Sequence, residues 1–201
     1  MKTVSVKRFL FLLLLSFCFP FFLAAQTEVP VNGLLVDDFR SGVSALGTTW
    51  EGFTDQVMGG KSEMQIGRGY EDGSPFLSLS GKVSLANNGG FIQTRLLLST
   101  DKNGTFDASS YSGIRVLARG KGDGYYIFLR ASGNRFPWSF FMAPLPVTGE
   151  WSSFDIPWDR FEKGDFGSFF KLNVRKLTSL AVVAYKKEFQ ASVDVREISF
   201  Y

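Results

Sequence analysis

Hydrophobic and polar positions alternate along residues 34–201 in short stretches, which are separated by turns rich in Gly, Asn, Asp and Ser. The alternation is clearest where Ile114, Val116 and Ala118 are interleaved with two arginines and a leucine. A period of two with one apolar face is typical of β-strands that cover a core. The pattern predicts strands at residues 34–39, 49–53, 62–66, 76–80, 90–98, 113–119, 125–131, 139–142, 152–156, 177–185 and 191–201.

No long segment of residues 34–201 shows helical periodicity with capping residues at its ends. The one helix candidate is a short turn at residues 158–161, which Pro157 would start from the first helical position. The glycine-rich run 120–124 is typical of a hairpin turn between two strands. Many short strands without helices favour two packed antiparallel sheets over a parallel α/β sheet. We therefore expect an all-β, two-sheet antiparallel sandwich of the jelly-roll type.

The first residues have the pattern of an export signal. Three basic side chains, Lys2, Lys7 and Arg8, lead into the apolar run 9–22, and small residues close the run at Ala25. The alternative is an uncleaved membrane anchor, but the run is shorter than the roughly 20 apolar residues that span a bilayer. We expect cleavage after Ala25 and a periplasmic or extracellular protein. The predicted organisation is a signal peptide at 1–25, a linker at 26–33 and a jelly-roll domain at 34–201.

Removal of the predicted signal changes the charge balance. The chain has 22 Lys and Arg against 19 Asp and Glu, and the signal holds three of the bases and no acid. The mature chain is therefore neutral, so its net charge indicates neither a nucleic-acid partner nor an anionic membrane surface. Contact with a membrane is expected only through the signal segment, if that segment is not cleaved.

The signal also contains the only cysteine, Cys18, and the chain has no histidine. The predicted mature protein consequently lacks disulfides, thiol or imidazole catalysts and Cys/His zinc sites. An exported protein without disulfides favours a bacterial envelope. We expect no enzyme activity and no cofactor; a structural calcium ion at Asp37 and Asp38 is the one metal site that the sequence suggests.

Two turns combine paired glycines with polar side chains. The first contains Gly59 and Gly60, and the second contains Gly89 and Gly90. Glycine pairs allow a backbone with positive φ, and polar groups on such loops can form a binding rim. The residues predicted to contact a ligand or partner at these turns and the strand beyond are Asp55, Gln56, Ser62, Asn88 and Arg95.

A structural explanation of the same turns stays open. Asp and Asn side chains often stabilise their own turns through hydrogen bonds to the backbone. On that interpretation the neighbouring Met58 and Phe91 fill the core, and the polar residues contact no ligand.

The two turns, written out, are Asp55-Gln-Val-Met-Gly-Gly-Lys-Ser62 and Asn88-Gly-Gly-Phe91. Together they resemble the two most recognisable motifs of the complex I intermediate-associated protein 30 family. The similarity continues through Tyr111-Ser-Gly-Ile114, Ile156-Pro-Trp158 and the closing Ile198-Ser-Phe-Tyr201. The resemblance implies a galactose-binding-like jelly roll and a role in assembling respiratory complex I, which is the role of mitochondrial members. The predicted export signal departs from those members.

Family 11 carbohydrate-binding modules are also similar, in the Asp-Phe opening, the Tyr-Ser-Gly-Ile step and the Glu-Trp strand. Sugar binding needs exposed aromatic faces with nearby hydrogen-bonding groups. Packing in the core or at its rim is the alternative role for each ring. The candidate platforms are Tyr125, Tyr126, Trp138 and Trp158, with Asp55, Asn88, Arg95 and Arg130 as polar partners.

Two functional hypotheses follow. The first is a non-catalytic, assembly-factor-like envelope protein that holds a protein or glycan partner through the loops at residues 54–62 and 87–95. The second is a carbohydrate-binding module that stacks sugars on exposed aromatic residues. A glycoside hydrolase would need two carboxylates about 5 to 9.5 Å apart, and no pair in the sequence is singled out for that role.

Overall fold

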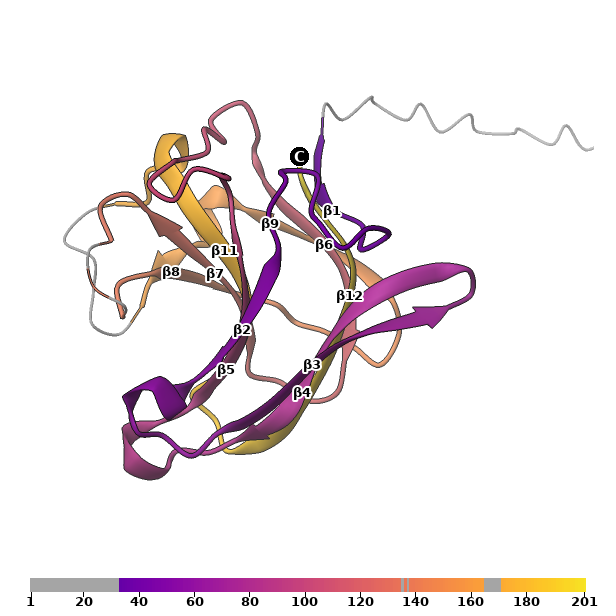
Figure 1. Ribbon diagram of the computed structural model, residues 1–201, viewed down its shortest axis with the longest axis vertical. Coiled ribbons are helices and arrows are strands. Elements are labelled where there is room, and N and C mark those ends of the chain that lie inside the picture. Colours follow the sequence, from indigo (N-terminus) through magenta and orange to yellow (C-terminus); the bar gives the residue numbers. More distant parts are fainter. Residues whose placement is uncertain (1–32, 135, 137, 165–170) are drawn as a thin grey trace, which may run out of the picture. The chain divides into compact units, whose positions relative to one another are not determined.

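The computed structural model describes residues 33–134, 136, 138–164 and 171–201. The predicted signal peptide and all but the last residue of the predicted linker lie outside these ranges. The described chain forms two six-stranded antiparallel sheets that face each other (Figure 1). Its only helices are short 3-10 turns, namely η1 (Asp55–Met58), η2 (Ala86–Asn88), η3 (Trp158–Arg160) and η4 (Val174–Lys176).

We refer to the two sheets as sheet A and sheet B. Sheet A has the order β3 (Glu63–Glu71), β4 (Ser74–Val83), β12 (Phe189–Phe200), β6 (Gly113–Gly120) and β9 (Ser152–Pro157), and β1 (Leu34–Asp37) also pairs with β12. Sheet B has the order β10 (Glu162–Lys163), β8 (Phe141–Pro144), β7 (Tyr125–Ala131), β11 (Leu177–Tyr185), β5 (Phe91–Leu97) and β2 (Trp50–Thr54). The prediction of an all-β jelly-roll sandwich is confirmed.

Each predicted strand has a counterpart, and the short turn predicted at 158–161 is η3. Pro157 immediately precedes η3 instead of occupying its first position. The structure adds β10, whose two residues are too few to show alternation. The hairpin predicted at 120–124 is wrong, because β6 belongs to sheet A and β7 to sheet B. The glycines there, Gly122 and Gly124, do have positive φ, but the turn carries the chain from one sheet to the other.

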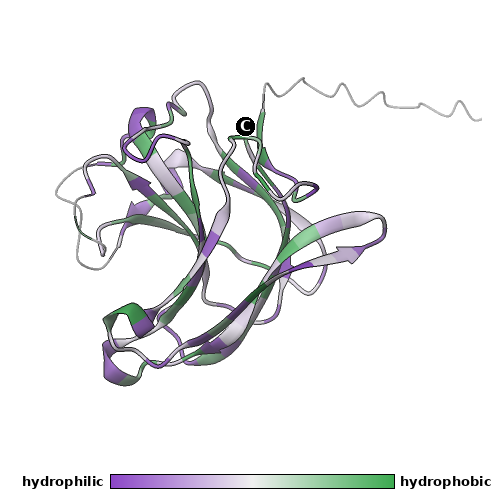
Figure 2. Ribbon diagram, viewed as in Figure 1, coloured by the Kyte–Doolittle hydropathy of each residue, from purple (hydrophilic) through white to green (hydrophobic). Residues whose placement is uncertain are grey.

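The main core lies between the sheets. Ile114, Val116 and Ala118 of β6 are fully buried, as their spacing predicts. On β12 the register shifts between Val195 and Glu197, and this irregularity allows both Val195 and Ile198 to face the core. Figure 2 shows hydrophobic residues along the strands of both sheets.

Sheet B carries a second apolar layer on its outer side. Phe128, Phe140, Ala181 and Val183 are buried there, apart from the main core. The rings of Phe128 and Phe140 stack with centroids 4.0 Å apart. Strand pairing explains the separation, because Ala181 lies opposite Phe128, and Leu180 and Val182 on either side of it face inward.

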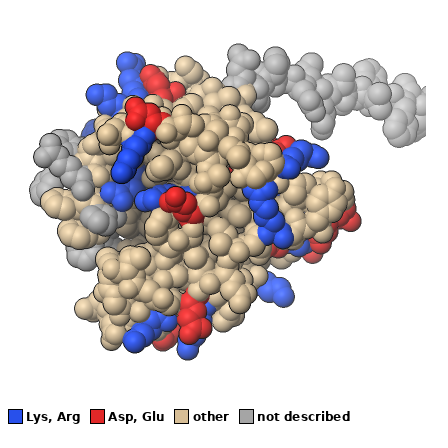
Figure 3. All heavy atoms as spheres, viewed as in Figure 1, with Lys and Arg blue, Asp and Glu red and all other residues tan. Residues whose placement is uncertain are grey.

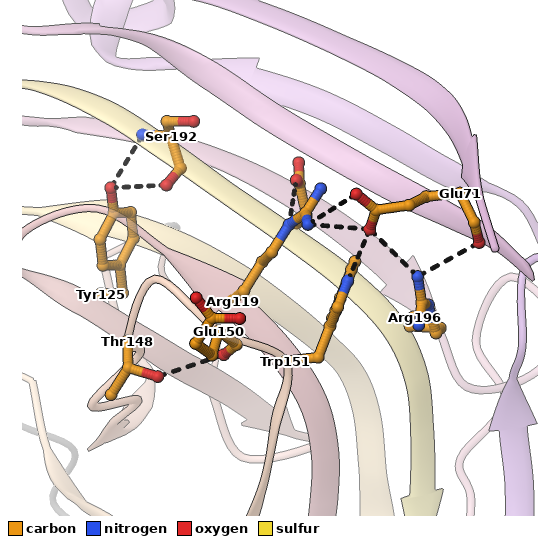
Figure 4. A network of polar contacts seen from close by, with 9 residues as sticks. Glu71, Arg119, Tyr125, Thr148, Glu150, Trp151, Ser192 and Arg196 are labelled. Atoms are coloured by element: carbon orange, nitrogen blue, oxygen red, sulfur yellow. Dashed lines mark hydrogen bonds and ion pairs between the residues drawn. The ribbon is translucent and has the colours of Figure 1, made fainter.

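The outer side of sheet A carries an ion network beside the turn of the β3–β4 hairpin (Figure 4). The carboxylate of Glu71 accepts hydrogen bonds from the Trp151 indole at 2.8 Å and from Arg119 at 2.8 and 3.0 Å. The Trp151 and Arg119 bonds hold the pKa of Glu71 below its ordinary value. The guanidinium groups of Arg119 and Arg196 also lie over the Trp151 ring, at 4.6 and 4.1 Å. This network leaves Trp151 enclosed by its own neighbours.

Candidate functional site

The two motif turns are joined by the carboxylate of Asp55. Its Oδ1 accepts the Ser62 N–H at 2.9 Å, and its Oδ2 accepts the Ser62 hydroxyl at 2.5 Å. Oδ2 also accepts the backbone N–H groups of Gly90, at 2.6 Å, and Phe91, at 3.3 Å. The side chain of Gln56 donates to the Ser62 carbonyl at 2.8 Å. We call this set of bonds the Asp55 clasp.

Asp55 and Ser62 are completely buried. Burial alone would raise the pKa of Asp55, but the hydrogen bonds from Ser62, Gly90 and Phe91 outweigh it and hold the pKa below the ordinary value. Asp55 is therefore a structural anion that links residues 35 positions apart. This placement fits the structural explanation of the turns better than direct contact with a ligand.

Four glycines surround the clasp. A Cβ atom at Gly60 would lie 2.3 Å from the Asp55 carboxyl carbon, and one at Gly89 would lie 2.4 Å from its Oδ2. Gly59 and Gly90 have positive φ, of 86° and 132°. Two of the motif glycines thus leave room for the carboxylate, and two allow the backbone to turn.

The clasp holds apolar side chains in solvent. Val57 and Met58, inside the first motif, are 72 % and 57 % exposed, and Leu85 beside the second is also exposed. Met58 therefore does not fill the core, contrary to the structural explanation. Asn88 lies in the same loops with positive φ and an exposed side chain, and the Asn87 side chain donates to the Gly59 carbonyl. We call Val57, Met58, Leu85 and Asn88 the loop surface.

The other predicted residues lie elsewhere, on the outer side of sheet B. Arg95 of β5 is flanked in the sheet by Glu51 of β2 and Ala181 of β11. Its guanidinium lies 4.5 Å from the centre of the Phe53 ring and contacts Glu51 at 3.2 Å. Burial, and secondly the positive charge of Arg95, lower the pKa of Arg130, so these two cations are near neighbours.

Arg130 connects this side of the sheet to an aromatic pair. Its guanidinium donates to the Phe136 carbonyl at 2.7 Å. The rings of Phe136 and Trp138 are parallel within 5°, with centroids 5.3 Å apart, and they are 55 % and 45 % exposed. We call the outer side of sheet B with Glu51, Phe53, Arg95, Arg130 and this pair the sheet-B face.

The remaining candidate platforms are engaged in packing. Tyr125 is buried, and its hydroxyl bonds to the Ser192 backbone (Figure 4). Tyr126 packs within the second apolar layer. Trp158 donates to the Tyr111 carbonyl at 2.6 Å and packs against the main core. Of the four predicted platforms, only Trp138 is an exposed residue.

The two aspartates proposed for calcium already have partners. Asp37 accepts the Phe39 N–H at 2.7 Å through one oxygen and the Trp50 indole at 2.9 Å through the other. Asp38 pairs with Arg40. Within the described residues, no three or more His, Cys, Asp or Glu side chains gather as metal ligands. These contacts lend the calcium prediction no support, and it stays untested.

Charged side chains are dispersed over the molecular face shown in Figure 3, with Lys and Arg often beside Asp and Glu. Across the part of the chain that is described, no helix is long and apolar enough to cross a membrane.

Sequence reasoning missed Glu51, Phe53 and Phe136 on the sheet-B face and Val57 and Leu85 on the loop surface. Glu51 is 44 positions from Arg95, and only the β2–β5 register reveals their contact. The sequence could have indicated Val57 as a surface contact residue, because a branched apolar residue inside a polar turn is unusual.

Several solved structures resemble the chain. The family 11 carbohydrate-binding module of a Clostridium thermocellum cellulosomal cellulase has a TM-score of 0.66 at 12 % identity, covering 85 % of this chain and 94 % of that one. The Clostridium thermocellum family 11 module in complex with a β-1,3-1,4-mixed-linked tetrasaccharide has a TM-score of 0.63 at 13 % identity, covering 84 % and 94 %. The family 30 module of another Clostridium thermocellum cellulase has a TM-score of 0.56 at 15 % identity, covering 85 % and 98 %. At these identities the likeness concerns the fold.

No curated protein sequence matches the chain significantly. The family model described as complex I intermediate-associated protein 30 matches residues 38–193, which are most of the sequence and include both motif turns. The chain belongs to the complex I intermediate-associated protein 30 family.

Proposed function

We propose that the mature chain is a non-catalytic glycan-binding protein of the bacterial cell envelope, and that the sheet-B face holds the glycan. One observation carries the proposal. Arg95 and Arg130 lie on the same side of sheet B, and Arg130 also bonds to the segment that carries the Phe136–Trp138 pair. An exposed aromatic pair beside hydrogen-bonding cations is the combination that sugar recognition needs.

The groups of the sheet-B face have complementary roles in this proposal. The exposed surface of Trp138 stacks against the C–H side of a sugar ring. Arg95 and Arg130 donate hydrogen bonds to sugar oxygens, and Glu51 accepts them from hydroxyls. The second apolar layer beneath supports these side chains, because Phe128 and Val183 are buried there. Export of the protein from the cytoplasm depends on the predicted signal peptide.

The fold supports the same proposal. One of the similar modules was solved in complex with a β-1,3-1,4-mixed-linked tetrasaccharide. We therefore place mixed-linkage β-glucan among the first ligands to test, together with acidic polysaccharides.

Affinity electrophoresis of residues 26–201 in gels that contain each polysaccharide tests the proposal. We expect retardation by at least one glycan and its loss in Trp138→Ala. Tyr70→Ala is the matched control, because Tyr70 is an exposed aromatic residue on the hairpin of the other sheet. Normal migration of the wild-type protein on a broad panel would refute glycan binding.

A second candidate function is an assembly-type role in which the loop surface holds a protein partner. The observation behind it is that the Asp55 clasp fixes two loops whose apolar side chains stay in solvent. Exposed apolar groups on a rigid support are typical of protein-binding surfaces. Figure 2 shows hydrophobic colour in η1, where Val57 and Met58 lie.

A tagged protein carrying Val57→Asp and Met58→Asp tests this second function. We expect it to lose a partner that the wild-type protein retains at stoichiometric yield after cross-linking in the envelope. Val43→Asp is the control, since Val43 is exposed in the segment between β1 and β2. Equal recovery of the partner with all three proteins would exclude the loop surface as its binding site.

A further inference from the structure

We propose that the sheet-B face selects glycans that carry an anionic group, a carboxylate or a sulfate, and that Arg95 is the residue that binds this group. The inference rests on the proposed glycan-binding function and specifies its ligand class. It derives from the environment of Arg95, whose guanidinium lies over the Phe53 ring and makes one described ion pair.

Arg95 is held in place mainly by stacking. The Phe53 ring lies 4.5 Å beneath its guanidinium, and this contact fixes the plane of the group without using its N–H donors. Arg115, on the other sheet, also lies near a ring, 5.2 Å from the centre of Tyr201, but two of its nitrogens bond to Asp155 at 2.6 and 2.7 Å. Arg115 thus binds a carboxylate of the protein through both oxygens, whereas Arg95 contacts its carboxylate partner through one.

The donors of Arg95 are underused. A guanidinium has five N–H groups, and the described structure shows one contact, from Nη2 to Glu51 at 3.2 Å. The Nε atom of Arg95 is buried and has no hydrogen-bond partner among the described residues. A bidentate anion is the ligand that a planar guanidinium binds best.

Glu51 is a weak competitor for this position. Its side chain is 54 % exposed, against 28 % for Arg95, and it touches the guanidinium through one oxygen. Ion pairs exposed to this degree contribute little stability in water. A ligand carboxylate or sulfate that approaches with two oxygens can therefore displace Glu51 from Arg95.

Arg130 lies on the same side of the sheet as Arg95, because Arg130 is opposite Ser179 and Arg95 is opposite Ala181 of β11. Besides Glu51, the described acidic residue whose register places it on this side of the sheet is Glu162 of β10, opposite Met142. Four strand spacings separate β10 from β5 in the sheet order, roughly 19 Å, and this exceeds the screening length of about 8 Å at physiological salt. Glu162 does not neutralise Arg95.

Matched polysaccharides test the inference. Polygalacturonate is compared with its fully methyl-esterified form, and ι-carrageenan is compared with agarose, so that each pair contrasts an anionic polymer with a neutral polymer of related backbone. Binding of residues 26–201 is measured by affinity electrophoresis and by calorimetry. We expect about tenfold to a hundredfold tighter binding to at least one anionic member, as charge-assisted hydrogen bonds imply. The pair that shows the effect identifies carboxylate or sulfate as the recognised group.

Substitutions at and near Arg95 test whether this residue causes the preference for the anionic polymer. We expect Arg95→Ala to abolish the preference for the anionic polymer, and Arg95→Lys to retain only part of it because a lysine cannot form the bidentate contact. Glu51→Gln should tighten anionic binding, since it removes the competing carboxylate. Arg115→Ala, on the opposite side of the sandwich, should leave the preference unchanged.

The outcomes separate the two proposals. If neutral and anionic members bind equally, or if Arg95→Ala keeps the preference, the anionic inference is wrong while glycan binding stands. If the wild-type protein binds neither member of either pair nor mixed-linkage β-glucan, glycan binding fails as well.

Discussion

Replacing Asp55 by Asn tests the role of the clasp with almost no change in shape. The carboxylate accepts four hydrogen bonds, one through Oδ1 and three through Oδ2. An Asn side chain has a single oxygen. The least disruptive rotamer keeps that oxygen in the place of Oδ2 and turns its NH₂ group toward the Ser62 N–H, so that two donors face each other.

The expected cost follows from these contacts. A buried donor without an acceptor costs about 1–3 kcal/mol, and the three remaining bonds lose the charge that made them about twice as strong. Relief from burying a charge offsets part of this loss, which leaves a destabilisation of about 3 kcal/mol. For a domain of this size, each kcal/mol lowers Tm by roughly 2–4 °C. We expect Asp55→Asn to melt about 6–12 °C below the wild-type protein.

Calorimetry of residues 26–201 at pH 7 measures this difference. Asp38→Asn is the matched control, because Asp38 is partly exposed and pairs with Arg40 at the surface; its Tm should change little. A Tm of Asp55→Asn within about 1 °C of the wild-type value would show that the clasp does not stabilise the fold in the way described.

The remaining predictions concern the clasp and the ion network. Gly60→Ala should destabilise by about 3 kcal/mol through collision with Asp55, whereas Gly67→Ala, which meets no atom within 4 Å, should be nearly neutral in the same urea titration. The pKa of Asp55 in the folded state is depressed, so the stabilisation that its charge provides is complete above the ordinary value of 3.8 and is lost as the pH falls through the lower folded value. The difference in unfolding free energy between the wild-type protein and Asp55→Asn should therefore shrink below about pH 4. A difference that stays constant down to about pH 2 would contradict this prediction. Glu71→Gln should weaken the bonds to Trp151 and Arg119 and speed amide exchange in the β3–β4 hairpin, and unchanged exchange there would mean that the network does not hold the hairpin.

The strands were predictable because their alternation is a local property of the sequence. Ile114, Val116 and Ala118 show it directly, and they are buried as expected. The turn at 120–124 shows where local reasoning ends. A glycine-rich turn between two strands is compatible with a hairpin or with a change of sheet, and the decision depends on pairing partners more than 45 residues away.

The candidate site was likewise predictable only where it depends on local sequence. The sequence predicted two separate polar turns that contain Asp55 and the four glycines, but the bond from Gly90 to Asp55 that joins them spans 35 positions and needs the folded chain. The side-chain chemistry of Arg95, Arg130 and Trp138 suits sugar binding, but their placement on one side of sheet B depends on strand register and on the Arg130 bond to Phe136. Residues that act through long-range contacts, such as Glu51, have no local signal.

The indole N–H signals of the four tryptophans provide the most direct test of the central claim, that glycan binds to the sheet-B face. Three of these groups donate to acceptors inside the protein, namely those of Trp50 to Asp37, Trp151 to Glu71 and Trp158 to the Tyr111 carbonyl. Trp138 has the exposed ring. In a ¹⁵N-labelled sample titrated with oligosaccharides of a retained glycan, the account predicts that the signal missing in Trp138→Phe shifts and the other three stay in place. Movement of another indole signal while that of Trp138 stays fixed would place the ligand elsewhere and contradict the account.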